Sequence, residues 1–189
     1  MIRNRNEAFV KIWGMSANPC FKTVNSLQQF IPIEWRAILV SDGSFTRNAA
    51  ILHQQNINIQ LIKQEEIFSS NIMNSASGLQ YEEKTTRFVW LINEEKKIAF
   101  AKSYRIINNK SKSNIFREHT PIGRHLIHSE KNAYRELNSI YLGYCEELEK
   151  YFHGQGPLWG RSYTIHLERM LTITIDEIFS PSLINKLKN

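Results

Sequence analysis

The periodicity of the apolar residues changes once along the chain, and this change most constrains the fold. Residues 34–40 and 46–52 form two runs with helical spacing. Pro32 precedes the first run in a permitted first-turn position, and Ser44 is the predicted N-cap of the second. From Ile57 onward apolar and polar residues alternate, which is the two-residue period of a β-strand. The sequence therefore predicts helices first and a sheet afterwards.

The later segments predict hairpins. The predicted strands are 57–62, 87–92, 98–107, 163–167 and 171–175. The run 87–92 is apolar on both faces, as in a central strand. A short helix is predicted after Pro121, and 158–161 is predicted to be a structural turn. We expect an α+β fold, a single domain with a mostly antiparallel sheet flanked by helices.

Length and composition limit the protein to an ordinary globular class. The chain has 189 residues, enough for one domain or two very small ones. Residues 1–25 are expected to be an irregular lead-in, and 26–189 the domain. The values of 42% hydrophobic and 22% charged residues exclude intrinsic disorder. Two cysteines, Cys20 and Cys145, are too few for a disulfide framework and are interpreted as buried thiols.

Membrane and secretion signals are not found in the sequence. No apolar run approaches the roughly 18–20 residues that span a bilayer. The first residues lack the apolar segment of a signal peptide. We therefore expect a soluble chain without an integral membrane segment, which works where it is made.

The net positive charge raises the question of whether the chain binds nucleic acid. The chain has 24 Lys+Arg and 18 Asp+Glu, a net charge of +6. Phosphate binding would need these charges gathered with aromatic residues in a stripe. The helix predicted from Ser44 carries only Arg47 as a base, and the other cations are scattered among acids. We expect no nucleic-acid partner.

Glu177 breaks the pattern of the last strand. Leu171, Ile173 and Ile175 share one face, and the same count places Glu177 on it. An ionised carboxylate on a core face costs several kcal/mol unless it is paired or its pKa rises. Glu177 is therefore either a structural ion pair, a strand end that reaches solvent, or an acid inside a cavity.

Arg87 is a second charged residue that is predicted to lie on an apolar strand face. It lies in phase with Val89 and Leu91 on a strand that is otherwise apolar. Its guanidinium either pairs with a buried acid, binds a carboxylate or phosphate ligand, or lies at an exposed strand start. Two glycine turns, 41–44 and 120–124, each lead towards a predicted helix and could direct backbone N–H groups at an anion.

Several kinds of chemistry have no motif here. His125 and His128 are three residues apart, but no Cys or acid lies at metal-ligand spacing from them. The sequence has no G-x-S-x-G elbow, P-loop or dinucleotide fingerprint. Nucleophilic, phosphoryl-transfer and redox chemistry are therefore disfavoured.

Together these residues give a family resemblance. From about Trp35 to Ser182 the chain resembles the chorismate pyruvate-lyase family, including its cyanobacterial and plastid-encoded members. The resemblance is carried by Ser41–Arg47, Arg87, Phe100–Ser103, Thr120–Arg124, Gly160–Tyr163 and Asp176–Pro181. Family members split chorismate into 4-hydroxybenzoate and pyruvate without metal or organic cofactor. The resemblance implies a carbon–oxygen lyase with a buried ligand cavity, serving quinone biosynthesis of the plastoquinone or ubiquinone type.

The resemblance also implies roles for residues. Arg87 matches the arginine that holds the ring carboxylate, and Glu177 matches the acid at the ring hydroxyl, so these two are the expected catalytic residues. Phe45 and Ile122 match cavity positions that are often methionine and leucine in relatives, and backbone N–H groups at Ile122 or Gly123 would assist binding. Glu177 either removes the ring proton or only orients the substrate, in which case the departing enolpyruvyl group takes the proton.

Two other readings stay open at this point. Effector-binding domains of some bacterial transcription regulators resemble relatives of this fold, so a non-catalytic binding module is the alternative function. A nucleic-acid-binding protein is the weaker rival. For the enzyme we expect a monomer, located in the plastid stroma if plastid-encoded and otherwise in a bacterial cytoplasm.

Overall fold

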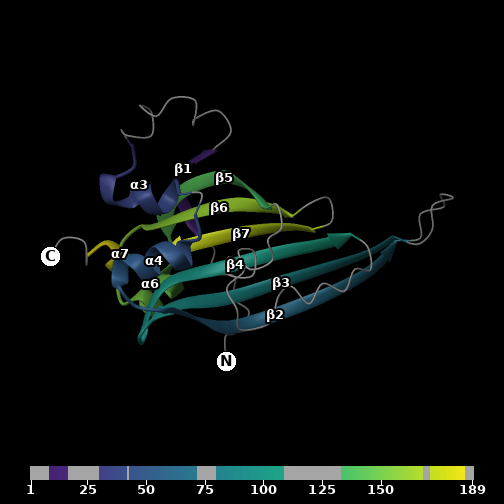
Figure 1. Cartoon of the computed structure of the whole chain (residues 1–189). Coiled ribbons are helices and arrows are strands. Elements are labelled where there is room, and N and C mark those ends of the chain that lie inside the picture. Colours follow the sequence, from purple (N-terminus) through teal and green to yellow (C-terminus); the bar gives the residue numbers. More distant parts are fainter. Residues whose placement is uncertain are drawn as a thin grey trace.

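A computed structural model describes residues 9–16, 30–41, 43–71, 80–108, 133–167 and 171–185. Seven strands form one antiparallel sheet in the order β1-β5-β6-β7-β4-β3-β2 (Figure 1). The strands are β1 (Val10–Ser16), β2 (Ile57–Asn71), β3 (Gln80–Asn93), β4 (Lys96–Asn108), β5 (Ala133–Tyr144), β6 (Leu158–Leu167) and β7 (Leu171–Phe179). The described helices are α3 (Ile33–Leu39), α4 (Phe45–His53), α6 (Glu146–Phe152) and α7 (Ser182–Asn185). The expected α+β class with one antiparallel sheet is confirmed.

The helices gather at one end of the sheet and cover both of its faces there (Figure 1). Neighbouring residues of a strand point to opposite faces. Leu91 and Phe179 accordingly belong to the core under α3, α4 and α7. Trp90 and Ile178 belong to the core under α6. This double burial explains why residues 88–92 are apolar on both faces, as the sequence predicts.

The two helices predicted before the sheet, 34–40 and 46–52, are confirmed as α3 and α4, with one difference in how the second begins. Ser44 precedes α4 but makes no side-chain hydrogen bond to the helix backbone. Its hydroxyl instead lies 2.7 Å from the Thr46 hydroxyl. The Ser41 hydroxyl holds the turn before α4: it accepts from the Gly43 amide at 3.1 Å and from Asn48 Nδ2 at 2.9 Å.

Two predictions for the chain's irregular parts are wrong within the described residues. Residues 158–161 begin strand β6 rather than forming a turn. Gly160 suggested a turn, but it lies in the strand under the ring of its cross-strand neighbour Tyr141. Within the predicted lead-in 1–25, Val10–Ser16 forms the edge strand β1, paired with β5. Its side chains are largely exposed, so the segment has no continuous apolar face to signal a strand.

Some predicted features lie outside the described residues. These are the helix after Pro121 and residues 168–170, which connect the predicted strands 163–167 and 171–175. The strands β2 and β3 extend beyond the predicted 57–62 and 87–92. Strand β5 and helix α6 were not predicted at all.

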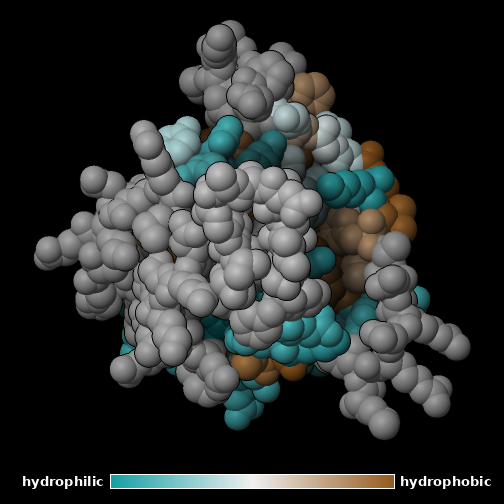
Figure 2. All heavy atoms as spheres, turned by 90° about the vertical axis from the view of Figure 1, so that its right-hand side faces the viewer, coloured by the Kyte–Doolittle hydropathy of each residue, from teal (hydrophilic) through white to brown (hydrophobic). Residues whose placement is uncertain are grey.

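The surface of the described part mixes side-chain types. Hydrophobic side chains reach the surface along the right-hand side of the face in Figure 2, next to hydrophilic ones. Exposed large hydrophobics come from several elements, among them β1, α3, α4 and β5. Such exposure is ordinary for a protein surface and gives no oligomeric state, so the monomer stays a prediction. None of the helices in the described part is both long and apolar enough to cross a membrane.

Candidate functional site

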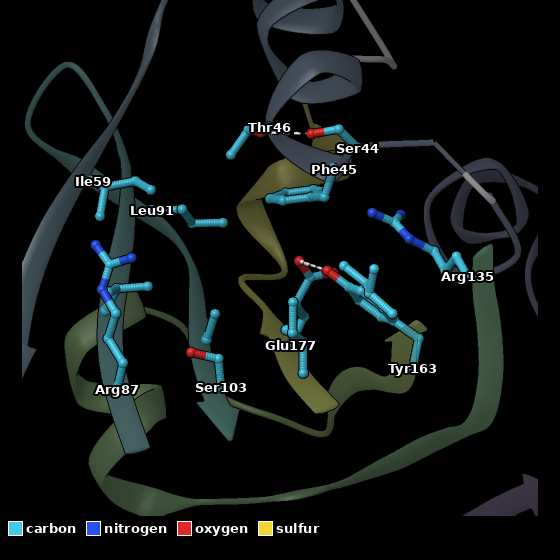
Figure 3. Close-up of a pocket in the computed structure, with 14 residues that line it drawn as sticks. Ser44, Phe45, Thr46, Ile59, Arg87, Leu91, Ser103, Arg135, Tyr163 and Glu177 are labelled. Atoms are coloured by element: carbon cyan, nitrogen blue, oxygen red, sulfur yellow. Dashed lines mark hydrogen bonds between the residues drawn. The ribbon is translucent and has the colours of Figure 1, made fainter. Parts of the chain in front are cut away.

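A cavity lies between the start of α4 and the face of the sheet that α4 covers (Figure 3). Its volume is about 60 Å³, counted as space open to the centre of a water molecule. One water needs roughly 10–15 Å³ by this measure, so the cavity can admit a small ligand. The lining residues are Ser44, Phe45, Thr46, Ile59, Arg87, Val89, Leu91, Ala101, Ser103, Arg135, Tyr163, Ile165, Ile175 and Glu177.

The sheet register brings the sequence-predicted residues to this cavity. Arg87 on β3 is opposite Ser103 on β4, which is opposite Ile175 on β7. Glu177 follows Ile175 by two positions and therefore shares its face. Strand β4 separates Arg87 from Glu177, and Glu177 lies two residues along β7 from the position level with Arg87. Two strand spacings of about 4.8 Å and a two-residue rise of about 6.8 Å place their backbones about 12 Å apart. The side chains of Arg87 and Glu177 both extend from the sheet into one cavity.

Glu177 is buried and held by two donors. It is 5% exposed, so a strand end reaching solvent is excluded. Arg161 Nε donates to its Oε2 at 2.8 Å, and the Tyr163 hydroxyl donates to its Oε1 at 3.0 Å. Arg161 lies directly opposite Glu177 in the β6–β7 register. The structure thus combines two of the expected alternatives: Glu177 forms a buried ion pair and also lines the cavity.

Arg161 connects this acid to the chain segment above the cavity. It is 1% exposed, and its Nη1 donates to the carbonyl oxygens of Ile38 at 2.6 Å and Ser41 at 3.0 Å. Ile38 belongs to the last turn of α3, where carbonyl groups lack helical partners and favour a cation. Arg161 therefore both neutralises Glu177 and fixes the end of α3 over the sheet.

Tyr163 is kept protonated by its surroundings. Burial, together with the negative charge of Glu177, raises the pKa of the Tyr163 hydroxyl well above its ordinary value of 10.0. The hydroxyl therefore stays a donor to Glu177 over the physiological pH range. With Arg161 on one oxygen and Tyr163 on the other, the Glu177 carboxylate has a fixed orientation.

Arg87 lies inside the cavity rather than at an exposed strand start. Because β3 begins at Gln80, Arg87 is in mid-strand and is only 7% exposed. In Figure 3 its side chain stands across the cavity from Glu177, near Ile59 and Leu91. The alternative of an exposed strand start is excluded, and ligand binding by Arg87 stays a prediction.

Phe45 forms part of the cavity wall, and substrate binding by Phe45 stays a prediction. It is the first residue of α4, is 3% exposed, and its ring centroid lies 4.8 Å from that of Phe179. The other two predicted binding residues, Ile122 and Gly123, lie outside the described residues. Among the described residues, no group of three His, Cys, Asp or Glu side chains could hold a metal ion.

Three arginine and tyrosine side chains at the site were missed by the sequence reasoning: Arg135, Arg161 and Tyr163. A signal for Arg161 was present. Counting back in twos from Leu167 through Ile165 and Tyr163 reaches Arg161, which places it on the apolar face of β6. The interpretation of Gly160 as a turn stopped that count too early.

Comparisons with known proteins identify the family of this chain. A family model described as chorismate pyruvate-lyase, Rv2949c-like, matches residues 39–187. This range includes every cavity residue and most of the chain. The chain belongs to the Rv2949c-like chorismate pyruvate-lyase family. The match confirms the resemblance seen in the sequence motifs.

Relatives of similar length are known from other organisms. An uncharacterized ycf21 protein of Porphyra purpurea is 37% identical over 161 residues, covering 82% of this chain and 85% of that protein. One from Antithamnion sp. is 37% identical over 164 residues and covers 86% of each chain. The crystal structure of the effector domain of PhnF from Mycobacterium smegmatis matches with a TM-score of 0.50 at 6% identity. It covers 76% of this chain and 92% of that one, and shows a shared fold.

Proposed function

We propose that this chain splits chorismate into 4-hydroxybenzoate and pyruvate. The observation that carries the proposal is one cavity lined by both Arg87 and Glu177, each less than a tenth exposed. Membership of a family described as chorismate pyruvate-lyase supports it. The apolar remainder of the lining, such as Val89 and Leu91, suits an unsaturated carbon ring.

The two polar groups on the ring of chorismate match the two charged side chains, Arg87 and Glu177, in the cavity. Chorismate carries a carboxylate at one end of its ring and a hydroxyl at the opposite end. Arg87 would hold the carboxylate with its two-pronged guanidinium, and Glu177 would accept a hydrogen bond from the hydroxyl. A backbone separation of about 12 Å leaves room for a six-membered ring between the two side chains.

The reaction needs positioning more than an added reagent. The bond between the ring and the ether oxygen breaks, the hydrogen on the hydroxyl-bearing carbon leaves, and the ring becomes aromatic. The enolpyruvyl group departs as pyruvate once its methylene carbon gains a proton. Orientation of a bound reactant can contribute roughly 7–11 kcal/mol to a reaction of this kind.

The contacts of Glu177 favour an orienting role. Each of its oxygens already accepts a hydrogen bond, one from Arg161 and one from Tyr163. Both bonds hold the carboxylate in one orientation and leave each oxygen a further lone pair to accept from the ligand. We therefore propose that Glu177 orients the ring hydroxyl, while the ring hydrogen passes directly to the methylene carbon of the departing group.

The product and the relatives suggest where the chain works. 4-Hydroxybenzoate is the aromatic ring unit expected for quinone biosynthesis, and this use belongs to the proposal. The ycf21 relatives from algae support a plastid as the location, with the stroma as the proposed compartment.

The test is incubation of purified protein with chorismate while 4-hydroxybenzoate is followed by absorbance. We expect product from the wild type. Arg87→Ala should abolish calorimetric binding of 4-hydroxybenzoate, because product and substrate share the ring carboxylate. Glu177→Gln should fold normally and lower turnover about 10- to 100-fold, the loss expected for a hydrogen bond to a charged group worth ~1.5–3 kcal/mol.

Matched variants separate these effects from general damage. Arg47→Ala removes an exposed arginine of α4, and Asp176→Asn changes the acid on the opposite face of β7. Both should retain wild-type binding and turnover. Ligand binding without product would favour the non-catalytic binding module. Unchanged affinity in Arg87→Ala would remove Arg87 from the site, and wild-type turnover in Glu177→Gln would leave Glu177 a structural acid.

A further inference from the structure

Arg135 is a second arginine of the cavity that the proposed reaction has not yet used. It comes from β5 and lines the cavity on the side opposite Arg87 (Figure 3). Its Nη1 donates to the Gly43 carbonyl, and its guanidinium lies 4.4 Å from the centre of the Tyr163 ring. A carbonyl oxygen and a ring face orient a guanidinium, but neither carries the full negative charge that would neutralise it.

The charges of the cavity favour a dianion. Its charged lining residues are Arg87, Arg135 and Glu177. The negative charge of Glu177 is already met by Arg161 at 2.8 Å. The described lining therefore carries two arginines, Arg87 and Arg135, and one acid that is already paired with Arg161. A ligand with two carboxylates would complement this arrangement better than a ligand with one.

The shape of the proposed substrate places its second carboxylate near Arg135. The ether carbon of chorismate is next to the hydroxyl-bearing carbon, at the end of the ring away from the ring carboxylate. With the ring carboxylate on Arg87 and the hydroxyl on Glu177, the enolpyruvyl group extends past Glu177. In Figure 3 the side chains found in that direction are those of Tyr163 and Arg135.

We propose that Arg135 binds the enolpyruvyl carboxylate of the substrate and so distinguishes substrate from aromatic product. This inference rests on the proposed function. The product 4-hydroxybenzoate has no second carboxylate, so it would make no charged contact with Arg135. The contact would hold the enolpyruvyl group in the orientation for elimination and would be lost when pyruvate leaves.

The test compares two ligands in one variant. Arg135→Gln should raise the KM for chorismate at least tenfold while changing the calorimetric Kd of 4-hydroxybenzoate less than threefold. Arg135→Lys should lie between the wild type and Arg135→Gln, because it keeps the charge but loses the planar fork. Arg47→Gln, at an exposed arginine of α4, should match the wild type for both ligands.

The outcomes separate the inference from the proposed function. Equal weakening of both ligands would show that Arg135 only holds the Gly43 segment, and unchanged values for both would also overturn the inference. If the wild type forms no product, the lyase proposal fails. In that case the calorimetric Kd of chorismate replaces its KM, and a selective loss in Arg135→Gln still supports the dicarboxylate site.

Discussion

At the scale of single residues, the buried pair of Glu177 and Arg161 is the least ordinary feature of the molecule. Both side chains are at most 7% exposed, and their ion pair is 2.8 Å long. Moving two charges out of water costs more than their attraction returns unless further hydrogen bonds assist. Tyr163 provides one to the acid, and the carbonyls of Ile38 and Ser41 accept two from the arginine. A site that needs a fixed carboxylate explains why such a pair would be kept.

The pair leads to a stability prediction. Arg161→Met should lower the free energy of unfolding by about 3–5 kcal/mol, because it leaves the Glu177 carboxylate buried without its cation. The double variant Arg161→Met/Glu177→Gln should lose less than the sum of the two single variants. Urea unfolding measures all three.

An exposed ion pair provides the control for this prediction. Lys63→Met removes a pair with Glu65 in which both side chains are about half exposed. Its free energy of unfolding should stay close to that of the wild type, because exposed pairs contribute little. Strictly additive losses at Arg161 and Glu177 would contradict the coupling.

At the scale of elements, the β5–β6 ladder depends on a glycine. A Cβ on Gly160 would lie 2.2 Å from Cε2 of Tyr141, the residue opposite it on β5. Real side chains do not approach so closely, so the Tyr141 ring covers the space that a side chain at position 160 would fill. The residue after this glycine is Arg161, so a shift of β6 here would displace the partner of Glu177.

Gly160→Ala should therefore lower the free energy of unfolding by about 1–3 kcal/mol, the usual cost of overpacking. It should also reduce chorismate turnover. Gly14→Ala on β1 is the matched strand variant, because its nearest contact would be an ordinary 3.5 Å. Unfolding in urea and the absorbance assay measure the two effects. Equal behaviour of the two alanine variants would show that Tyr141 moves aside without cost.

Sequence patterns predicted the elements that are buried on one or both faces. The two-residue count placed Glu177 correctly on the covered face, and the apolar run placed Arg87 on an inner strand. Strands β1 and β5 were missed because their described side chains are mostly exposed or half-buried, so burial imposes no regular alternation on them. Arg135 lies on β5 and was missed with it. The long-range partners of Arg161, residues 38 and 41, follow from packing and have no local signature.

At the scale of the whole molecule, the two arginines Arg135 and Arg161 join both ends of one short segment to the sheet. Arg161 donates to the carbonyl of Ser41, and Arg135 donates to the carbonyl of Gly43. The segment leads into α4, whose first residue, Phe45, forms the cavity wall. The position of α4 over the cavity is therefore coupled to the charged groups inside it. This connects the stability of the fold to the geometry of the site.

The buried tyrosines extend this coupling to a pH dependence of the whole fold. Burial, with a smaller effect of nearby carboxylates, raises the pKa of Tyr141 and of Tyr163 well above 10.0. Above pH 10 the unfolded chain releases tyrosine protons that the native protein keeps, so the unfolded state binds fewer protons. Stability must then fall with rising pH, by up to about 1.4 kcal/mol per pH unit for each tyrosine. Between pH 8 and pH 9.5 these two groups should cause little change.

Urea unfolding between pH 8 and pH 11.5 tests this prediction, with the slope against pH above 10 as the measured quantity. Tyr163→Phe should be less stable at every pH because Glu177 loses a donor. Above pH 10 its free energy of unfolding should fall less steeply with pH than that of the wild type, by up to about 1.4 kcal/mol per pH unit, because one of the two buried tyrosines is gone. Tyr134→Phe removes an exposed tyrosine, 65% accessible, and should leave the slope unchanged. A wild-type slope retained in Tyr163→Phe would show that the hydroxyl titrates alike in both states. The bond from Tyr163 would then contribute nothing to keeping Glu177 in place, because a donor that holds the carboxylate must itself stay protonated.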